Sequence, residues 1–170
     1  MQPRVDVLFE GTEAGLAAQV EQVKSMMGST ITDAGKNVWS ARRELCSAEK
    51  GNTEFAVAKV AALPTQMADT FETIARLSVG KQRWSVVAQA TGIGWGRIEG
   101  ETSTMESVLR ELRAEIERGG GSLVIAHRPA RISALDAWGN GGDALPLMRA
   151  VKWQFDPRGT LNPGRFVGGI

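Results

Sequence analysis

The chain has 170 residues, of which 42% are apolar and 23% charged, and its net charge is +1. This balance is typical of a globular protein with a packed core, and it disfavours nucleic acid as a partner. The single cysteine excludes an internal disulfide, and no apolar run approaches the roughly 18 residues of a membrane span. No signal peptide is recognisable, so we expect one cytoplasmic domain over residues 1–170.

The first predicted elements are a strand and a helix. Residues 4–10 alternate between apolar and polar side chains, with Val5, Val7 and Phe9 on one face, as in a strand. Thr12 can cap the helix that follows. Apolar residues then recur at helical spacing. This stripe consists of Leu16, Val20, Val23 and Met27.

The region 28–52 is less regular, but a short helix is predicted over residues 39–45. Arg42 and Arg43 lie near Trp39 in this helix, where a guanidinium fork could bind a carboxylate. A solvated helix face explains the same pattern. Cys46 follows, and we expect it to be an inert packing residue.

From about residue 53 to residue 127 the predicted order of elements is β-α-β-β-α-β. This order indicates an α+β fold of the ferredoxin-like type, with an antiparallel sheet covered on one face by two helices. Residues 1–27 add a further β-α unit that could extend the sheet. The predicted strands cover residues 54–63, 83–90, 95–99 and 122–127.

Two helices connect these strands. The first is marked by Met67, Phe71 and Ile74 at helical spacing. The second begins with Ser103-Thr-Met-Glu106, which has the form of a capping box, and ends at the glycines of residues 119–121. Its predicted apolar stripe consists of Met105, Val108, Leu109, Leu112 and Ile116.

The sequence contains no Walker loop, Rossmann fingerprint, zinc-ligand spacing or nucleophile elbow. The glycine-rich residues 92–96 join two predicted strands, so they predict a hairpin turn rather than a phosphate loop. His127 is the only histidine and has no co-ligand, so it predicts a structural position at a strand end and no metal site. Arg97 lies on an inner strand, where its charge must reach water, a carboxylate or a ligand. Exposure on the open sheet face is the simplest of these.

The C-terminal segment is the most constrained part of the sequence. A helix over residues 143–155 places Leu147, Val151 and Phe155 on one apolar face, through which we expect it to pack. The helix must stop at Asp156 because Pro157 follows. Prolines and glycines then alternate, and Asn162 is held at a turn with its amide available. The tail could clasp its own domain or contact a ligand, and we expect it to fold back or be held by a neighbouring molecule.

The tail resembles the C-terminal end of FAD-linked oxidases of the vanillyl-alcohol-oxidase type, in which such a helix leads to Leu-Asn-Pro-Gly. A narrower resemblance, over about residues 135–170, is to glycolate oxidase FAD-binding subunits. It is carried by Asp136-Ala-Trp-Gly139, Leu145-Pro-Leu-Met-Arg149 and the stretch from Phe155 to the Gly-Arg-Phe-Val-Gly-Gly-Ile170 ending.

The resemblance implies the C-terminal cap domain of a flavoprotein subunit that takes part in FAD-dependent oxidation of a 2-hydroxy acid, glycolate to glyoxylate. FAD would belong to the full-length protein, with Asn162, Pro163 and Gly164 beside the flavin. No cofactor is expected on these 170 residues, which we expect to be inactive alone. Arg42 and Arg97 are the candidates for the substrate carboxylate, and no catalytic residue is assigned.

The implied partners are an N-terminal FAD-binding domain, expected to be absent from these residues, and the other glycolate oxidase subunits, a flavoprotein and an iron–sulfur subunit. Through them the protein could associate peripherally with the inner membrane. The hairpin at residues 89–94 lacks the histidines that some relatives place near the flavin, which argues against histidine-based dehydrogenation there. The alternative is a stand-alone ferredoxin-like binding or regulatory module without catalysis.

Overall fold

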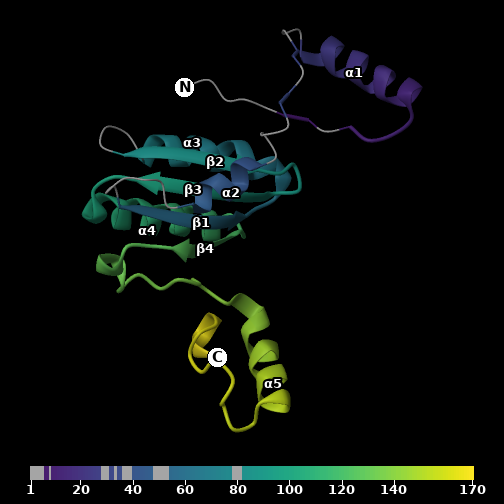
Figure 1. Ribbon diagram of the computed structural model, residues 1–170. Coiled ribbons are helices and arrows are strands. Elements are labelled where there is room, and N and C mark those ends of the chain that lie inside the picture. Colours follow the sequence, from purple (N-terminus) through teal and green to yellow (C-terminus); the bar gives the residue numbers. More distant parts are fainter. Residues whose placement is uncertain are drawn as a thin grey trace. The chain divides into compact units, whose positions relative to one another are not determined.

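The computed structural model describes residues 6–7, 9–27, 31–32, 34–35, 40–47, 54–77 and 82–170. The chain forms two compact units, residues 1–41 and residues 42–170, each described by itself below (Figure 1). Among the described residues, every helix is too short or too polar to cross a bilayer.

The first unit contains one long helix, α1 (Glu13–Met27). Thr12 caps it as predicted, because its Oγ1 accepts a hydrogen bond from the Gly15 amide at 3.4 Å. The predicted strand over residues 4–10 is wrong where it can be checked: residues 6, 7, 9 and 10 have no regular structure, and Val5 lies outside the described residues. A lone strand has no ladder partner to satisfy its backbone, and these residues pair with no strand of the described sheet.

The second unit is built on a four-stranded sheet in the order β2-β3-β1-β4, in which all neighbouring strands are antiparallel. α3 (Met67–Leu77) connects the first two strands in sequence, and α4 (Thr102–Arg118) connects the last two. The α+β fold and its ferredoxin-like order are therefore confirmed. The strands are β1 (Phe55–Ala61), β2 (Arg83–Ala88), β3 (Ile93–Glu99) and β4 (Ser122–His127).

The hydrophobic core lies between the sheet and the two helices (Figure 1). The predicted stripe of α4 is buried along its whole length, with Leu109 fully inaccessible. Burying one such leucine contributes about 1.5–3 kcal/mol. Alternate residues of the central strand β1 face this stripe. They are Ala56, Ala58 and Val60.

The predicted hairpin is present, but of the glycine-rich residues 92–96 only Gly92 lies in the turn between β2 and β3, and residues 93–96 belong to β3. Gly92 has φ = +90°, a value that a side chain rarely adopts, and the Gln89 amide donates to the Ile93 carbonyl at 2.8 Å. A Cβ at Gly92 would also lie 2.0 Å from the Ala62 carbonyl oxygen. A phosphate loop is therefore excluded at this position, and the glycine is required by the turn.

The predicted capping box at Ser103 is wrong. α4 starts at Thr102, its N-cap is Glu101, and no side chain caps it. The helix begins early because the Thr102 hydroxyl donates to the Glu54 carboxylate, which ties the first turn to the start of β1. Ser103 lies inside the first turn, and its hydroxyl donates to Glu101 Oε1 at 3.1 Å.

The predicted short helix before β1 is present as α2 (Ala41–Cys46). The expectation for Cys46 is wrong, because its side chain is exposed. Leu45 is instead the buried residue, with 6% of its surface accessible. A helix this short has room for one inward position, and the bulkier apolar side chain takes it.

The C-terminal helix is α5 (Leu145–Phe155), and it ends before Asp156 as predicted. Its expected packing face is wrong: Leu147, Val151 and Phe155 are 68%, 50% and 80% exposed. The tail is held to the helix by polar contacts, because Arg149 Nη2 donates to the Gly168 carbonyl and Lys152 Nζ to the Leu161 carbonyl. Leu147 and Val151 line an open groove between the helix and the tail. The predicted folding back of the tail is confirmed, and the apolar face of α5 is left bare.

Candidate functional site

Charged and aromatic side chains gather on the face of the sheet opposite α3 and α4. Strand register places them in rows that run across the strands. One row holds Arg83, Glu99 and Phe55. The next holds Ser85, Arg97, Val57 and His127. A third holds Val87, Trp95, Lys59 and Val124.

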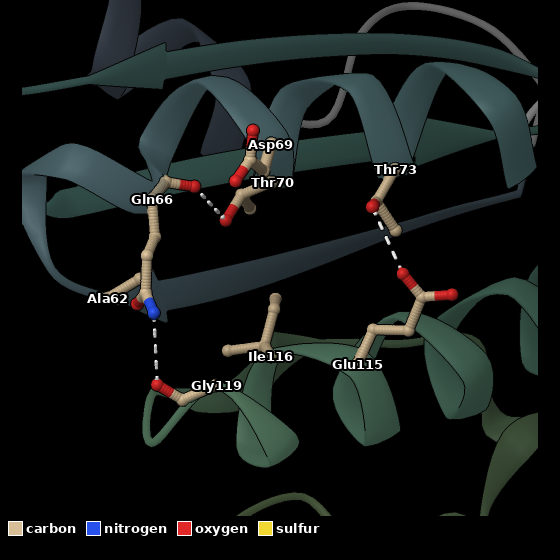
Figure 2. Close-up of a pocket in the computed structure, with 8 residues that line it drawn as sticks. All are labelled: Ala62, Gln66, Asp69, Thr70, Thr73, Glu115, Ile116 and Gly119. Atoms are coloured by element: carbon tan, nitrogen blue, oxygen red, sulfur yellow. Dashed lines mark hydrogen bonds between the residues drawn. The ribbon is translucent and has the colours of Figure 1, made fainter.

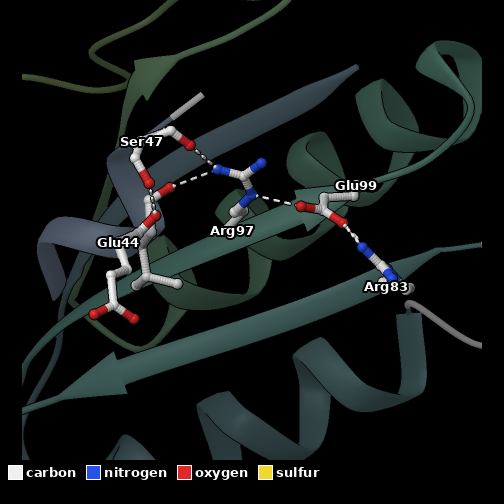
Figure 3. A network of polar contacts seen from close by, with 6 residues as sticks. Glu44, Ser47, Arg83, Arg97 and Glu99 are labelled. Carbon is white, nitrogen blue, oxygen red and sulfur yellow. Dashed lines mark hydrogen bonds and ion pairs between the residues drawn. The ribbon is translucent and has the colours of Figure 1, made fainter. Parts of the chain in front are cut away.

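Arg97 lies at the centre of a polar network on this face (Figure 3). Its Nε donates to Glu99 Oε1 at 2.7 Å, and its Nη1 donates to the carbonyl oxygens of Leu45 at 3.1 Å and Ser47 at 2.6 Å. These carbonyls lie at the C-terminal end of α2, where a cation is favoured. Arg97 is only 6% exposed, so the simple expectation of surface exposure is wrong. Its charge meets a carboxylate, one of the three outcomes considered for it.

Glu99 is shared between two guanidinium groups. Arg83 Nη2 lies 2.6 Å from its Oε2, while Arg97 holds its other oxygen. The hydrogen bond from Arg83, with that from Arg97, lowers the pKa of the Glu99 carboxyl against the opposing effect of burial. Both oxygens of the Glu99 carboxylate are therefore engaged by arginines.

Phe55 connects the arginine to the single histidine. The guanidinium of Arg97 lies 3.8 Å from the centre of the phenyl ring, and the imidazole of His127 stacks on that ring at 4.4 Å. A bulge opposite Val57 and Ala58 brings His127 to this face of the sheet. Among the described residues, no group of three or more metal-ligating side chains could hold a metal ion.

The second predicted substrate residue cannot be compared with the first. Arg42 is in α2, but its side chain lies outside the described residues. The structure therefore gives no geometry that joins Arg42 to Arg97.

The predicted flavin-contact residues lie in a turn that is organised by Asp156. Its carboxylate accepts hydrogen bonds from the amides of Thr160 and Leu161 at 2.9 and 2.8 Å, and Lys152 Nζ lies 2.6 Å from it. Lys152, with these amides, holds the pKa of the Asp156 carboxyl far below its usual range. The carboxylate thus fixes the path of the chain from the end of α5 to Leu161.

Asn162 follows this turn with φ = +47°, in the left-handed region. Asparagine tolerates this region better than most residues, which explains its place here. Its exposed side chain borders an open groove of about 610 Å³ between α5 and the tail. The groove is lined mainly by apolar side chains, with Lys152, Asn162 and Arg165 as its polar members.

A smaller crevice of about 170 Å³ lies between α3 and α4 (Figure 2). Several of its polar groups are engaged with one another: Thr73 donates to Glu115 Oε2, and Gln66 Nε2 donates to the Gly119 carbonyl. Arg76, with Thr73, lowers the pKa of the Glu115 carboxyl. These contacts hold the two helices together, which is a structural role.

Sequence reasoning missed Phe55, Glu99 and Asp156 as members of these sites. Register could have found the first two, because Phe55 and Glu99 are cross-strand partners in the hairpin-linked sheet. Asp156 was recognised only as a helix stop. Its position before Pro157 also suits a carboxylate that accepts from amides further along the turn.

Residues 99–166 match the family model described as FAD linked oxidases, C-terminal domain. The match runs from the last residue of β3 through α5 to Phe166, so it includes Asp156 and the Asn162 turn. No curated protein and no solved structure matches the chain. This segment is therefore similar to the C-terminal domain of FAD-linked oxidases, a family that implies an oxidoreductase, FAD in the full-length proteins and an FAD-binding partner domain.

Proposed function

We propose that the chain is the C-terminal cap domain of a glycolate-oxidase-type flavoprotein subunit, which takes part in the oxidation of a 2-hydroxy acid such as glycolate. The observation that carries this proposal is the family match over residues 99–166. It coincides with a ferredoxin-like sheet and a preformed tail that resembles those of such subunits. In this proposal the 170 residues act as the cap and need an FAD-binding domain for activity.

The proposed place for the flavin is beside Asn162, Pro163 and Gly164. The groove next to Asn162 suits part of such a group, because it combines apolar walls with an amide and the guanidinium of Arg165. Its volume lies within the range of ligand sites in proteins, about 300–1,000 Å³. The turn is held in shape by Asp156, so little ordering would accompany contact with a cofactor or domain.

FAD supplies the acceptor for a hydride from the α-carbon of the hydroxy acid. The residues of this chain would position the substrate and exclude water, and they would take no covalent part in the reaction. Arg97 and Arg42 are proposed for the substrate carboxylate. Arg97 could offer only Nη2, since its Nε and Nη1 hold Glu99, Leu45 and Ser47. A direct contact therefore needs the ligand to approach that edge of the guanidinium.

The proposed partners are the N-terminal FAD-binding domain and the remaining glycolate oxidase subunits, a flavoprotein and an iron–sulfur protein. The bare apolar face of α5 suits a surface that another polypeptide covers, since Leu147, Val151 and Phe155 are each at least half exposed. The compartment proposed is the cytoplasm, with the inner membrane reached through the partner subunits.

The test uses a polypeptide in which the FAD-binding domain precedes this chain. We expect it to retain flavin, and Asn162→Ala to lower the flavin content while leaving the circular dichroism spectrum unchanged. Asn162→Gly is the matched control for the backbone, because glycine accepts the φ of +47° and also lacks the amide. Both variants should lose flavin equally. Full flavin retention by both would remove the assignment of Asn162, and absence of flavin from the unaltered polypeptide would refute the proposed function.

A further inference from the structure

Lys59 occupies an unusual position on the sheet. It lies in β1, the strand between β3 and β4, and it is the single residue of β1 that is exposed. Its cross-strand neighbours are Trp95 and Val124, and Val87 completes the same row. A cation is thus set among apolar side chains in the middle of a sheet.

Among the described strand residues of this face, cations outnumber carboxylates. Its cations are Lys59, Arg83 and Arg97, and the carboxylate that register places among them is Glu99. Glu99 is already held by both arginines at 2.6 and 2.7 Å. Lys59 makes no hydrogen bond or ion pair with any described residue.

This imbalance becomes costly once the face is covered. An ammonium that is taken out of water without an anion costs several kcal/mol, so it needs a partner of opposite charge. If the chain is the cap of a flavoprotein, as proposed above, another domain or a ligand meets part of its surface. The group that then faces Lys59 must be anionic.

We propose that Lys59 receives the carboxylate of a small organic acid on this face, with Trp95 and Val124 as the apolar walls beside it. This inference rests on the proposed function for the identity of the acid, a 2-hydroxy acid. The ammonium offers three donors on a flexible stem, which suits a carboxylate that arrives from solvent. Arg97 is the weaker candidate for the same group, because three of its hydrogen bonds already fix α2 and Glu99.

Under this proposal Arg97 and Lys59 have different roles. Arg97 is a positioning residue that holds the sheet face and α2 together, and Lys59 is the contact residue. The apolar surroundings of Lys59 strengthen a charge-assisted hydrogen bond when water is displaced. Val87 on β2 and Ile93 on β3 extend this apolar surface beside Trp95.

The test is a titration of the 170-residue protein with glycolate, followed through the indole NH resonance of Trp95 and by calorimetry. We expect the Trp95 resonance to move and Lys59→Met to weaken binding about tenfold or more, the loss of one charge-assisted hydrogen bond. Glycolamide has the same shape without the charge and should not bind. Lys24→Met removes an exposed lysine from α1 and is the matched protein control.

Three results would overturn the inference: no movement of Trp95 with glycolate, equal binding of glycolamide, or binding of glycolate that survives Lys59→Met. None of them bears on flavin retention by the polypeptide with its FAD-binding domain, so the proposed function could stand without this site. Conversely, glycolate binding through Lys59, together with no flavin in the polypeptide that includes the FAD-binding domain, would keep the anion site and refute the oxidase.

Discussion

Arg97 illustrates how a residue that looks like a ligand contact in the sequence can have a structural function. A lone arginine between Gly96 and Ile98 suggested a charge waiting for water or substrate. In the fold it joins β3 to the end of α2 and to Glu99, and its guanidinium lies against Phe55. The partners come from residues up to 52 positions away, so no local pattern could have revealed them.

Replacing Arg97 should therefore destabilise the protein. Arg97→Met leaves the carbonyls of Leu45 and Ser47 without a donor, and we expect the free energy of unfolding to fall by about 3 kcal/mol. Amide exchange at residues 45–47 should rise as α2 detaches, which can be measured by hydrogen-exchange mass spectrometry. Arg110→Met is the control, because that guanidinium is 63% exposed and should change stability by about 0.5 kcal/mol or less. Equal losses of stability in both variants would contradict the structural role of Arg97.

Asp156 should stabilise the turn around it and contribute little to the stability of the core. In Asp156→Asn the amides of Thr160 and Leu161 lose a charged acceptor, and Lys152 loses its ion pair. We expect severalfold faster amide exchange at residues 160 and 161, with α4 unaffected. Asp143→Asn, a substitution of an exposed carboxylate, should change amide exchange neither at residues 160 and 161 nor in α4. If amide protection at residues 160 and 161 were the same in Asp156→Asn as in the unaltered protein, the turn would not depend on the carboxylate.

The same carboxylate predicts the pH dependence of the tail. Its pKa is depressed in the folded protein, so its stabilising effect is present above the ordinary aspartate pKa of about 3.9 and is lost as the pH falls below it. The amide resonances of Thr160 and Leu161 should stay unchanged from neutral pH down to about pH 4 and move only below that. A transition near neutral pH would be inconsistent with this assignment.

At the scale of elements, the two apolar helices of the second unit behave in opposite ways. α4 and α5 both show an apolar stripe in the sequence, and only that of α4 is buried. Helical periodicity predicts that a face is apolar, but it does not say what covers it. This explains why the strands, the helices and their order were predictable from the sequence, while the docking of α5 was not.

The contrast can be measured with one substitution in each helix. Leu109→Ala removes a fully buried side chain of α4 and should cost about 2–5 kcal/mol. Phe155→Ala removes a larger side chain that is 80% exposed, and it should change stability by about 0.5 kcal/mol or less. Chemical denaturation followed by circular dichroism gives both values. A large loss in Phe155→Ala would mean that α5 is covered in the protein as it exists in solution.

At the scale of the whole molecule, the chain is two units rather than one continuous core. The sheet, α3 and α4 contain the main cluster of buried residues, and α1 contains none. The single domain expected over residues 1–170 remains a prediction. The flavin turn, the substrate arginines and the partner subunits also remain predictions.

Removal of residues 1–39 is a direct test of that organisation. We expect the shortened protein to keep its cooperative thermal transition, with a midpoint within a few degrees of the original, because the buried cluster is complete without those residues. Differential scanning calorimetry measures the midpoint. Loss of the cooperative transition would show that the first unit is required to fold the second.

The bulge beside Val57 determines the face of the sheet on which His127 lies. Ala126 is the extra residue between Ile125, which faces the core, and His127, which stacks on Phe55. Deleting that one residue would remove the bulge and leave the imidazole on the outer face, because the histidine would then follow Ile125 directly. With Ala126 retained and the ladder regular, Ala126 would instead lie opposite Val57, and alternation would turn position 127 toward the core. The face on which this chain displays its histidine is thus set by the bulge in β4 as much as by the composition of the strand.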